Sequence, residues 1–344
     1  MQTTNNISLK PYHSFACEET ANHFTIITSE QAIEAVAQWS KINQQALLIL
    51  GSGSNILFTK NFEGIVAKME LMGIKKLSET PSEVLLEVGA GENWHYFVSY
   101  CVQKGWGGIE NLSLIPGTVG ASPIQNIGAY GVEVKDTIKC VSAYDTLNNK
   151  WVNFNNNECE FGYRTSIFKN SNKRYIISKV QFTLQKQPTL KTDYGVIREV
   201  LHDRNIKNPS LVDISNAIIQ IRTEKLPDPK KIGNAGSFFK NPIIPIDQFE
   251  KLKNEFPQLI AYPIADTSYK IAAGWLIEAC GWKCLKKGNV GCYEKQALVI
   301  VNYGALSGKE IFDFSESIIQ SVKNKFGITL ERDCLLYTSP SPRD

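Results

Sequence analysis

Short apolar runs and helix-spaced apolar residues alternate along the chain, which is typical of a mixed α and β fold. Ser29 can cap a helix that continues to about Ser40, with Ile33, Val36 and Ala37 on its apolar face. The run ALLIL that follows has the length and composition of a buried strand. The first half of the chain therefore predicts an α+β domain in two lobes. Further strands are predicted at residues 84–91, 137–144, 175–184 and 297–301.

Beyond Pro188 the predicted helices become more frequent, and a second unit is expected to begin there. Ser307 and Glu310 have the spacing of a capping box, which predicts a helix that ends at Gly327. The pattern therefore predicts two domains, at residues 17–187 and 188–333. Elsewhere, helices are predicted at residues 93–104, 212–222, 246–256 and 270–280.

Composition and charge exclude several classes of protein. The 344 residues are 43% hydrophobic and 21% charged, as in an ordinary globular protein. A net charge of +3 without a block of Lys and Arg argues against a nucleic-acid surface, and no apolar run is long enough to span a membrane. The N-terminus lacks a basic region followed by an apolar core, so we expect no signal peptide and a cytoplasmic location.

Eight cysteines are scattered along the chain without the spacing of a disulfide framework. Cys280, Cys284 and Cys292 could be considered as metal ligands, but no histidine lies near them and their spacing fits no zinc pattern. We therefore expect free thiols and no metal.

Residues 111–131, NLSLIPGTVGASPIQNIGAYG, contain no charged residue and are rich in glycine. Gly117, Gly120, Gly128 and Gly131 allow a left-handed backbone and a close approach of the main chain to a ligand. Consecutive backbone N–H groups in such turns can bind an anion without a lysine. This stretch, called the glycine loop below, therefore predicts a ligand-binding loop; the alternative is a buried structural crossover.

The sequence GSGSN at 51–55 is a second candidate loop, placed directly after the predicted strand ALLIL. It is not a dinucleotide-binding fingerprint, because that motif must open a helix, whereas residues 56–58 are β-prone and have no cap. A strand–turn–strand arrangement still offers N–H groups and hydroxyls to a diphosphate.

Five segments together resemble the UDP-N-acetylenolpyruvoylglucosamine reductase family, in the same order along the chain. They are LGSGSNILF at 50–58, VGAGENWH at 88–95, IENLSLIPGTVGASPIQNIGAYG at 109–131, FGYRTSIFK at 161–169 and GNAGSFFKNP at 233–242. The match covers about Leu9 to Asp333. The resemblance implies an α+β fold in which a two-lobed FAD-binding domain of the vanillyl-alcohol oxidase (PCMH) type precedes a C-terminal α+β substrate-binding domain.

The resemblance also implies a cofactor. The glycine loop has neither His nor Cys to tether a flavin covalently, so we expect non-covalent FAD. By resemblance, the residues that contact FAD are Gly51, Ser52, Gly53, Ser54, Asn55, Pro116, Gly117, Gly120, Ser122, Pro123, Asn126 and Gly128.

Three residues match catalytic positions of the family. Arg164 corresponds to an arginine that stabilises the developing enolate, a task that suits a planar, permanently charged guanidinium. Ser237 corresponds to the proton donor, with Gly236 leaving room beside it and two following phenylalanines expected to help exclude water. Asp333 lies where the family has a glutamate; it is one methylene shorter. Without the motifs, a lone loop arginine and a turn serine would be read as structural.

The resemblance further implies the reaction, the reduction of UDP-N-acetylglucosamine enolpyruvate to UDP-N-acetylmuramate with NADPH as co-substrate, by a monomer that binds no nucleic acid or membrane. The substrate residues carried over are Tyr130, Tyr163, Tyr194, Lys225, Asn241 and Gln296. Tyr194 lies in an inserted segment that resembles the substrate-closing loop of the family's longer subtype. Two alternatives remain: an oxidase of the same flavin superfamily, and a non-catalytic flavin or nucleotide-sugar binding protein.

The last eleven residues, CLLYTSPSPRD, correspond to the translation of a transposase-type sequencing adaptor. We therefore expect 334–344 to be an artefact that replaces the family's final strand. An adaptor base completing a broken codon would also put Asp333 in place of an encoded Glu. On this interpretation the carboxylate of Asp333 lies on a frayed end, and the protein binds FAD but turns over slowly.

Overall fold

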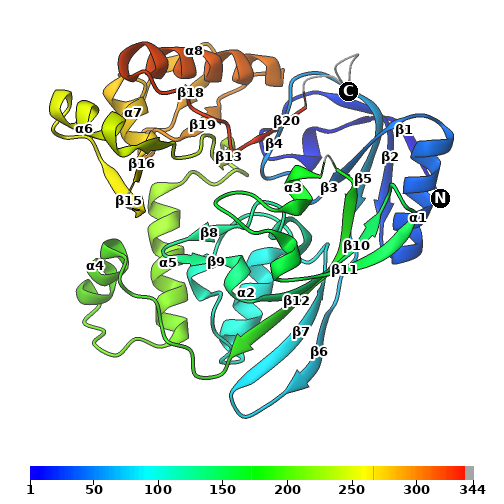
Figure 1. The fold of residues 1–344 in the computed structure, drawn as a ribbon. Coiled ribbons are helices and arrows are strands. Elements are labelled where there is room, and N and C mark those ends of the chain that lie inside the picture. The colour runs from blue at the N-terminus through cyan, green and yellow to red at the C-terminus, as the bar shows by residue number, and fades with distance from the viewer. Residues whose placement is uncertain (172, 266, 338–344) are drawn as a thin grey trace. The chain divides into compact units, whose positions relative to one another are not determined.

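The computed structural model describes residues 1–171, 173–265 and 267–337, and its elements are labelled in Figure 1. The chain divides into two compact units, each made of segments that are discontinuous in sequence. No helix among the described residues is long and apolar enough to cross a membrane. Unit 1 comprises Met1–Ile7, Ala21–Ser52 and Glu63–Glu224, and unit 2 comprises Ser8–Thr20, Gly53–Phe62 and the chain from Lys225 onward.

Unit 1 begins with a four-stranded sheet in the order β1-β2-β5-β3. The predicted strand ALLIL is β3, and it pairs in parallel with β5. The predicted helix is α1 (Glu30–Ile42), whose first turn is capped because the Ser29 hydroxyl accepts a hydrogen bond from the N–H of Ala32 at 3.2 Å. The strands are β1 (Thr4–Ser8), β2 (Thr20–Ile27), β3 (Ala46–Leu50) and β5 (Phe62–Met69).

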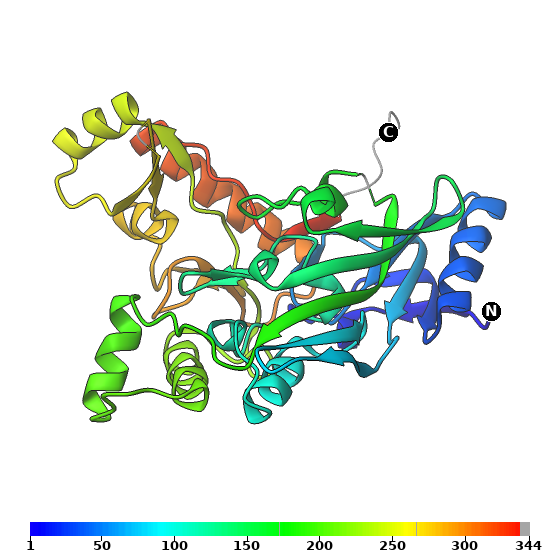
Figure 2. The same cartoon turned by 60° about the horizontal axis from the view of Figure 1, so that its bottom comes forward.

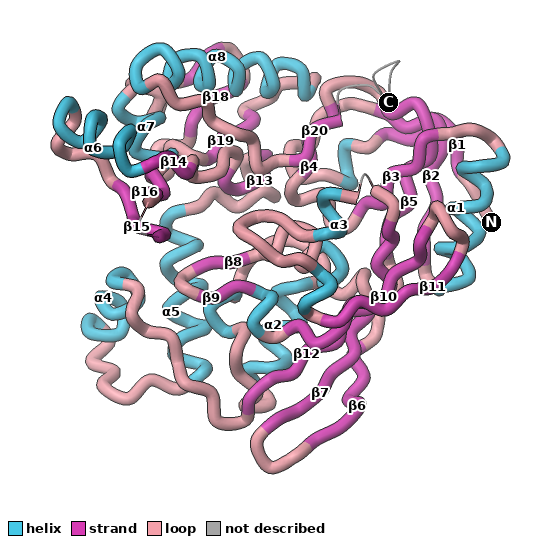
Figure 3. The backbone as a smooth tube through the Cα atoms, viewed as in Figure 1, coloured by secondary structure: helices cyan, strands magenta, loops and turns pink. Residues whose placement is uncertain are grey.

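A second, antiparallel sheet of unit 1 has the order β11-β10-β12-β7-β6, and its strands lie side by side in Figure 3. Helix α2 (Trp94–Gln103), capped by Asn93, packs on it through Phe97, whose ring centroid lies 4.9 Å from that of Phe182. Both sheets contribute side chains to one continuous hydrophobic core. The strands are β6 (Ile74–Glu79), β7 (Glu83–Gly89), β10 (Ile138–Asp145), β11 (Lys150–Asn155) and β12 (Tyr175–Gln185).

The expected domain boundary at Pro188 differs from the division seen in the structure, in which unit 1 continues to Glu224. Helices α4 (Gly195–Asp203) and α5 (Leu211–Lys225) lie side by side and share an apolar cluster (Figures 1 and 2). They stay with unit 1 because Leu211 packs against its core and the Ser215 and Ser113 hydroxyls are 2.8 Å apart.

Unit 2 contains a sheet in the order β13-β19-β18-β17 and a smaller sheet in the order β14-β16-β15. The helix expected at 270–280 is wrong at its start: α7 begins at Ala273, because Lys270 lies in β16, paired with both Ile243 and Tyr262. The elements are β13 (Gly233–Ser237), β14 (Ile243–Pro245), α6 (Ile246–Glu255), β15 (Ala261–Ala265), β16 (Ser268–Ile271), α7 (Ala273–Ala279), β17 (Lys286–Lys287), β18 (Val290–Cys292), β19 (Val299–Asn302) and α8 (Gly308–Phe326).

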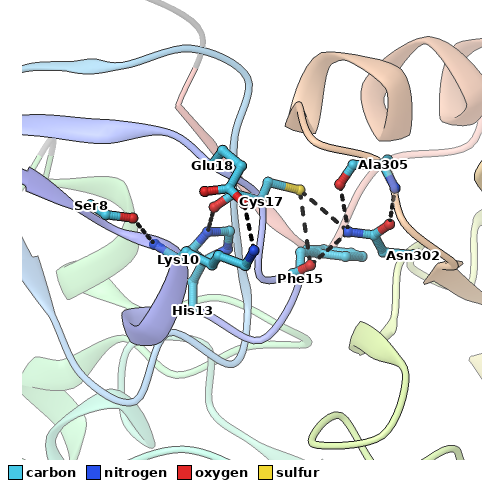
Figure 4. Close-up of polar contacts among 8 residues, drawn as sticks. All are labelled: Ser8, Lys10, His13, Phe15, Cys17, Glu18, Asn302 and Ala305. Atoms are coloured by element: carbon cyan, nitrogen blue, oxygen red, sulfur yellow. Dashed lines mark hydrogen bonds and ion pairs between the residues drawn. The ribbon is translucent and has the colours of Figure 1, made fainter.

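The N-terminal segment 8–20 belongs to unit 2 because side-chain and main-chain groups of that unit hold it (Figure 4). The amide of Asn302 donates hydrogen bonds to the carbonyl oxygens of Phe15 at 2.8 Å and Ala305 at 3.1 Å. The N–H of Glu18 donates to the carbonyl of Leu306 at 2.7 Å. Sequence periodicity cannot reveal this attachment, since the paired residues are nearly 300 positions apart.

The expectation of a frayed C-terminal end is wrong for residues 335–337. They form strand β20 (Leu335–Tyr337), which pairs in parallel with β4 (Ile56–Phe58). Cys334 is 4% exposed and Tyr337 is 7% exposed, so both side chains belong to the interior of unit 2. The adaptor interpretation of residues 338–344 lies outside the described residues.

Helix α8 begins at a glycine that packs against β4, and we expect Gly308→Ala to destabilise unit 2. A Cβ there would lie 1.9 Å from the carbonyl oxygen of Phe58, which is backbone and cannot turn aside. Overpacking of this kind typically costs about 1–3 kcal/mol. Urea unfolding of the two proteins measures the difference.

Gly195→Ala is the matched control, because Gly195 also begins a helix but a Cβ there meets nothing within 4 Å. We expect that variant to be neutral or more stable by up to about 1 kcal/mol. Equal unfolding midpoints for the two variants would show that the contact between α8 and β4 is not tight.

Candidate functional site

The glycine loop is folded as short 3-10 turns and a two-residue hairpin rather than as regular structure. Leu114, Asn126 and Tyr130 have positive φ angles of 57°, 45° and 50°, which residues with side chains adopt at a cost. Of the four glycines expected to allow a left-handed backbone, Gly117 and Gly131 have positive φ angles. The elements are η2 (Glu110–Leu112), η3 (Val119–Ala121), β8 (Gly128–Ala129) and β9 (Val132–Glu133).

Close packing explains another glycine of this loop. A Cβ on Gly120 would lie 2.5 Å from the Cβ of Ala90, so the residue must be small whatever the ligand. Two polar side chains are also used internally. The Ser122 hydroxyl donates to the carbonyl of Val119 at 2.7 Å, and the Asn126 amide donates to the carbonyl of Gly162 at 3.1 Å. These two side chains are already engaged within the protein, so the loop offers a ligand mainly its main-chain groups.

The GSGSN turn is similarly constrained by its own surroundings. A Cβ on Gly51 would lie 2.7 Å from the Thr118 hydroxyl, which belongs to the glycine loop. Gly53 has a φ of 65°, and a Cβ there would lie 2.0 Å from the carbonyl oxygen of Tyr12. The Asn55 amide donates to the carbonyl of Asp333 at 3.1 Å, which ties this turn to a predicted catalytic residue.

Arg164 is presented by a tight turn in unit 1, in which Gly162 and Thr165 exchange main-chain hydrogen bonds of 3.1 and 3.3 Å. Its φ of 55° is again left-handed. One guanidinium nitrogen donates to the carbonyl of Gly128 at 3.0 Å. The structure therefore brings the predicted charge-stabilising arginine to the glycine loop, from which it is distant in sequence.

A second arginine, Arg222 of α5, also reaches the glycine loop. Its Nε donates to the carbonyl of Leu114 at 3.2 Å, and its side chain hydrogen-bonds that of Tyr130. Burial lowers the pKa of Arg222 and raises that of Tyr130. Among the residues the structure describes, no carboxylate forms an ion pair with Arg222. A half-buried guanidinium of this kind is suited to an anionic or electron-rich ligand group.

Ser237 lies at the end of β13 in unit 2, where its side chain is exposed. The register shifts between Asn234 and Ser237, and Gly236 within this bulge has a φ of 67° and open space within 4 Å of the position that a Cβ would take. Bulges commonly redirect a side chain at functional sites. Phe238 and Phe239, the two phenylalanines expected to help exclude water, are 0% and 2% exposed and anchor this part of the chain in the core of unit 2.

Asp333 lies beside Ser237 in the same unit. Its N–H donates to the carbonyl of Phe238 at 2.9 Å. The preceding Arg332 holds the segment to α8, since its Nε donates to the Ser315 hydroxyl at 2.9 Å. The main-chain hydrogen bond to Phe238 and the bridge between Phe239 and Arg332 therefore bring the backbone of Asp333 next to the residue that follows Ser237.

The predicted substrate residues fall into separate groups. In unit 1, the rings of Tyr130 and Tyr194 meet edge to face with centroids 5.5 Å apart, whereas Tyr163 is 36% exposed beside Arg164. Lys225 is exposed at the end of α5.

In unit 2, Asn241 and Gln296 both lie at the first turn of α7. The carbonyl oxygen of the Asn241 side chain accepts from the N–H of Ala273 at 2.9 Å, and that of Gln296 lies 3.1 Å from where a Cβ on Gly274 would be. Residues 55 positions apart are thus brought to one turn of the helix.

Sequence reasoning missed Arg222 as a site residue. The only available signal is its position three residues before Lys225 in the sequence IRTEKLPDP. An arginine near a helix end is normally solvated, so its burial could be recognised only from the structure.

Comparison with known proteins identifies the relationship. Residues 21–150 match the family model described as FAD binding domain, and residues 228–337 match that of UDP-N-acetylenolpyruvoylglucosamine reductase, C-terminal domain. The second match includes Cys334–Tyr337, part of the segment interpreted as an adaptor. The fold is thus α+β, with an FAD-binding domain of the PCMH type and a C-terminal domain.

Two curated relatives carry the name UDP-N-acetylenolpyruvoylglucosamine reductase. That of Chromobacterium violaceum is 44% identical, over 98% of this chain and 99% of its own length. That of Amoebophilus asiaticus is 45% identical, over 96% and 98% respectively. A crystal structure of the enzyme of that type from Thermus caldophilus has the same fold, with a TM-score of 0.69, 20% identity and coverage of 98% of this chain and 100% of that one. The chain therefore belongs to the UDP-N-acetylenolpyruvoylglucosamine reductase family.

Proposed function

We propose that this protein reduces UDP-N-acetylglucosamine enolpyruvate to UDP-N-acetylmuramate, with FAD as cofactor and NADPH as the source of hydride. The observation that carries the proposal is the 44% identity to a curated reductase over 99% of that relative's length. We place the reaction in peptidoglycan precursor synthesis in the cytoplasm, carried out by a monomer.

The residues around the glycine loop fit a non-covalent flavin. The left-handed positions at Leu114, Gly117 and Tyr130 turn main-chain groups of the loop in directions that regular structure does not allow. Arg222 offers a half-buried cation to an electron-rich or anionic group of the cofactor. When bound, the flavin supplies the hydride chemistry, and the protein's part is to orient the reactants and to stabilise charge. The residues we propose as FAD contacts are Gly51, Ser52, Gly53, Ser54, Asn55, Pro116, Gly117, Gly120, Ser122, Pro123, Asn126 and Gly128.

Hydride addition leaves a negative charge that must be stabilised and a carbon that must receive a proton. Residues of the protein would perform both tasks. Addition of hydride to the enolpyruvyl β-carbon places negative charge on the α-carbon and its carboxylate. Arg164 would stabilise that charge through its guanidinium, and Ser237 would donate its hydroxyl proton to the α-carbon. Asp333, whose N–H donates to the carbonyl of Phe238 next to Ser237, would assist protonation or orient a water.

Six residues are our proposed contacts of the substrate. Tyr130, Tyr163, Tyr194 and Lys225 offer hydroxyl and ammonium donors that suit a diphosphate. Asn241 and Gln296, together at the first turn of α7, offer amides that suit a uracil or sugar group.

The proposal is tested by following the flavin. We expect acid precipitation of purified protein to release yellow FAD into the supernatant, because no His or Cys of the glycine loop can tether it. Anaerobic NADPH should bleach the flavin absorbance, and the enolpyruvyl substrate should restore it. Flavin retained in the pellet would contradict non-covalent binding. Oxygen consumption with an alcohol and without NADPH would favour an oxidase, and bound flavin that never turns over would favour a binding protein.

A further inference from the structure

Asn111 joins two segments that carry predicted substrate residues. It lies in the 3-10 turn η2 at the start of the glycine loop and is 0% exposed. Its Nδ2 donates hydrogen bonds to the carbonyl oxygens of Tyr130 at 3.1 Å and Lys191 at 3.0 Å. Lys191 lies three residues before Tyr194, so one amide group links the glycine loop to the tyrosine-bearing segment 187–194.

The orientation of this amide is fixed by its surroundings. Reversing it would place the side-chain oxygen against two carbonyl oxygens, which accept but cannot donate. In the observed orientation, Oδ1 of Asn111 is buried, and no group of residues 1–171, 173–265 or 267–337 donates a hydrogen bond to it. A buried, unsatisfied oxygen is unfavourable, and an apolar side chain of the same shape would avoid it. Packing alone therefore does not account for an asparagine here.

The two segments joined by Asn111 present rings that touch each other. Tyr130 has a left-handed backbone, and its ring meets that of Tyr194 edge to face at 5.5 Å. Arg222 holds the Tyr130 side chain from the α5 side. Asn111 thus bonds the main chain of Tyr130, whereas Arg222 contacts the side chain of the same residue.

We propose that Asn111 is a positioning residue that docks segment 187–194 onto the glycine loop, and so presents Tyr130 and Tyr194 together to the nucleotide-sugar substrate. This inference rests on the proposed function. It predicts that loss of the Asn111 donors affects use of the enolpyruvyl substrate and spares the reduction of flavin by NADPH.

The docking is tested without reference to activity by limited trypsin digestion. In Asn111→Leu, cleavage after Lys191 should become faster, on the order of tenfold, because the hydrogen bond that holds the Lys191 carbonyl to the glycine loop is lost. Cleavage after Lys207, an exposed site beyond α4, is the internal reference and should not change. Ser178→Ala is the matched control, since Ser178 is equally buried in unit 1 but its hydroxyl bonds Glu30 and the carbonyl of Ser142 instead.

The effect on the reaction is tested in the holoenzyme. Asn111→Leu should raise the KM for the enolpyruvyl substrate on the order of tenfold, with the rate of flavin reduction by NADPH unchanged. In Tyr194→Ala, the same Asn111 substitution should add little to KM, because both changes act through one segment. Asn111→Ala, which removes the donors and adds neither bulk nor charge, is the second variant and guards against a failure of Asn111→Leu to fold.

Each outcome decides the inference. Unchanged cleavage after Lys191 in both Asn111 variants would overturn the docking role. Faster cleavage with an unchanged KM, or effects on KM that add fully to those of Tyr194→Ala, would overturn the positioning role. If the unaltered protein bound FAD but did not reduce the enolpyruvyl substrate, the proposed function would fail, whereas the trypsin result would still decide the docking.

Discussion

Ser237→Ala should slow the reoxidation of reduced flavin by the enolpyruvyl substrate by about 10²–10⁴-fold, while NADPH reduces the flavin at a nearly normal rate. Ser237 is exposed at the end of β13, on a bulge that Gly236 makes possible, and its hydroxyl is the proposed proton donor. Hydride transfer from NADPH needs no proton from this group. Anaerobic stopped-flow absorbance of the flavin measures the two half-reactions separately.

The control is Ser317→Ala, which removes a hydroxyl from the same unit. Ser317 donates within α8 to the carbonyl of Asp313 at 3.1 Å and has no place in the proposed chemistry. We expect both half-reactions of that variant to match the unaltered protein. If Ser237→Ala slowed both half-reactions equally, Ser237 would have a role in binding or packing and another group would supply the proton.

Tyr337→Ala should destabilise unit 2 by about 3–5 kcal/mol, the range typical of removing a buried aromatic ring. Tyr337 is 7% exposed, and its ring centroid lies 4.4 Å from that of Phe62 and 6.2 Å from that of Phe58. Its carbonyl oxygen also accepts hydrogen bonds from the N–H and hydroxyl of Thr59. Urea unfolding, followed by tryptophan fluorescence, gives the change in free energy.

Leu335 provides the control because it lies on the same strand but is 43% exposed. We expect Leu335→Ala to cost less than about 1 kcal/mol, as for most exposed positions. If the free energy of unfolding of Tyr337→Ala lay within about 0.5 kcal/mol of that of the unaltered protein, β20 would contribute nothing to the stability of unit 2.

The sequence by itself determined the elements whose signals are local. Ser29 caps α1 as predicted, and Asn93 caps α2 at the predicted start of that helix, because a cap is a hydrogen bond to an N–H two or three residues away. The run ALLIL is β3, and Gly327 ends α8 in a left-handed conformation. The motifs that carry the family resemblance are also local, and the full-length relationship confirms them.

The tertiary structure decided how these pieces are grouped and what the polar side chains do. Segment 8–20 belongs to unit 2 because Asn302 holds it, and β20 forms because it meets β4. Similarly, Asn55 bonds the carbonyl of Asp333. Such contacts join residues up to 287 positions apart, and each side chain finds its partner only when the backbone has folded. Periodicity reports which face of an element is apolar, but it contains no information on which distant group will meet a given amide or guanidinium.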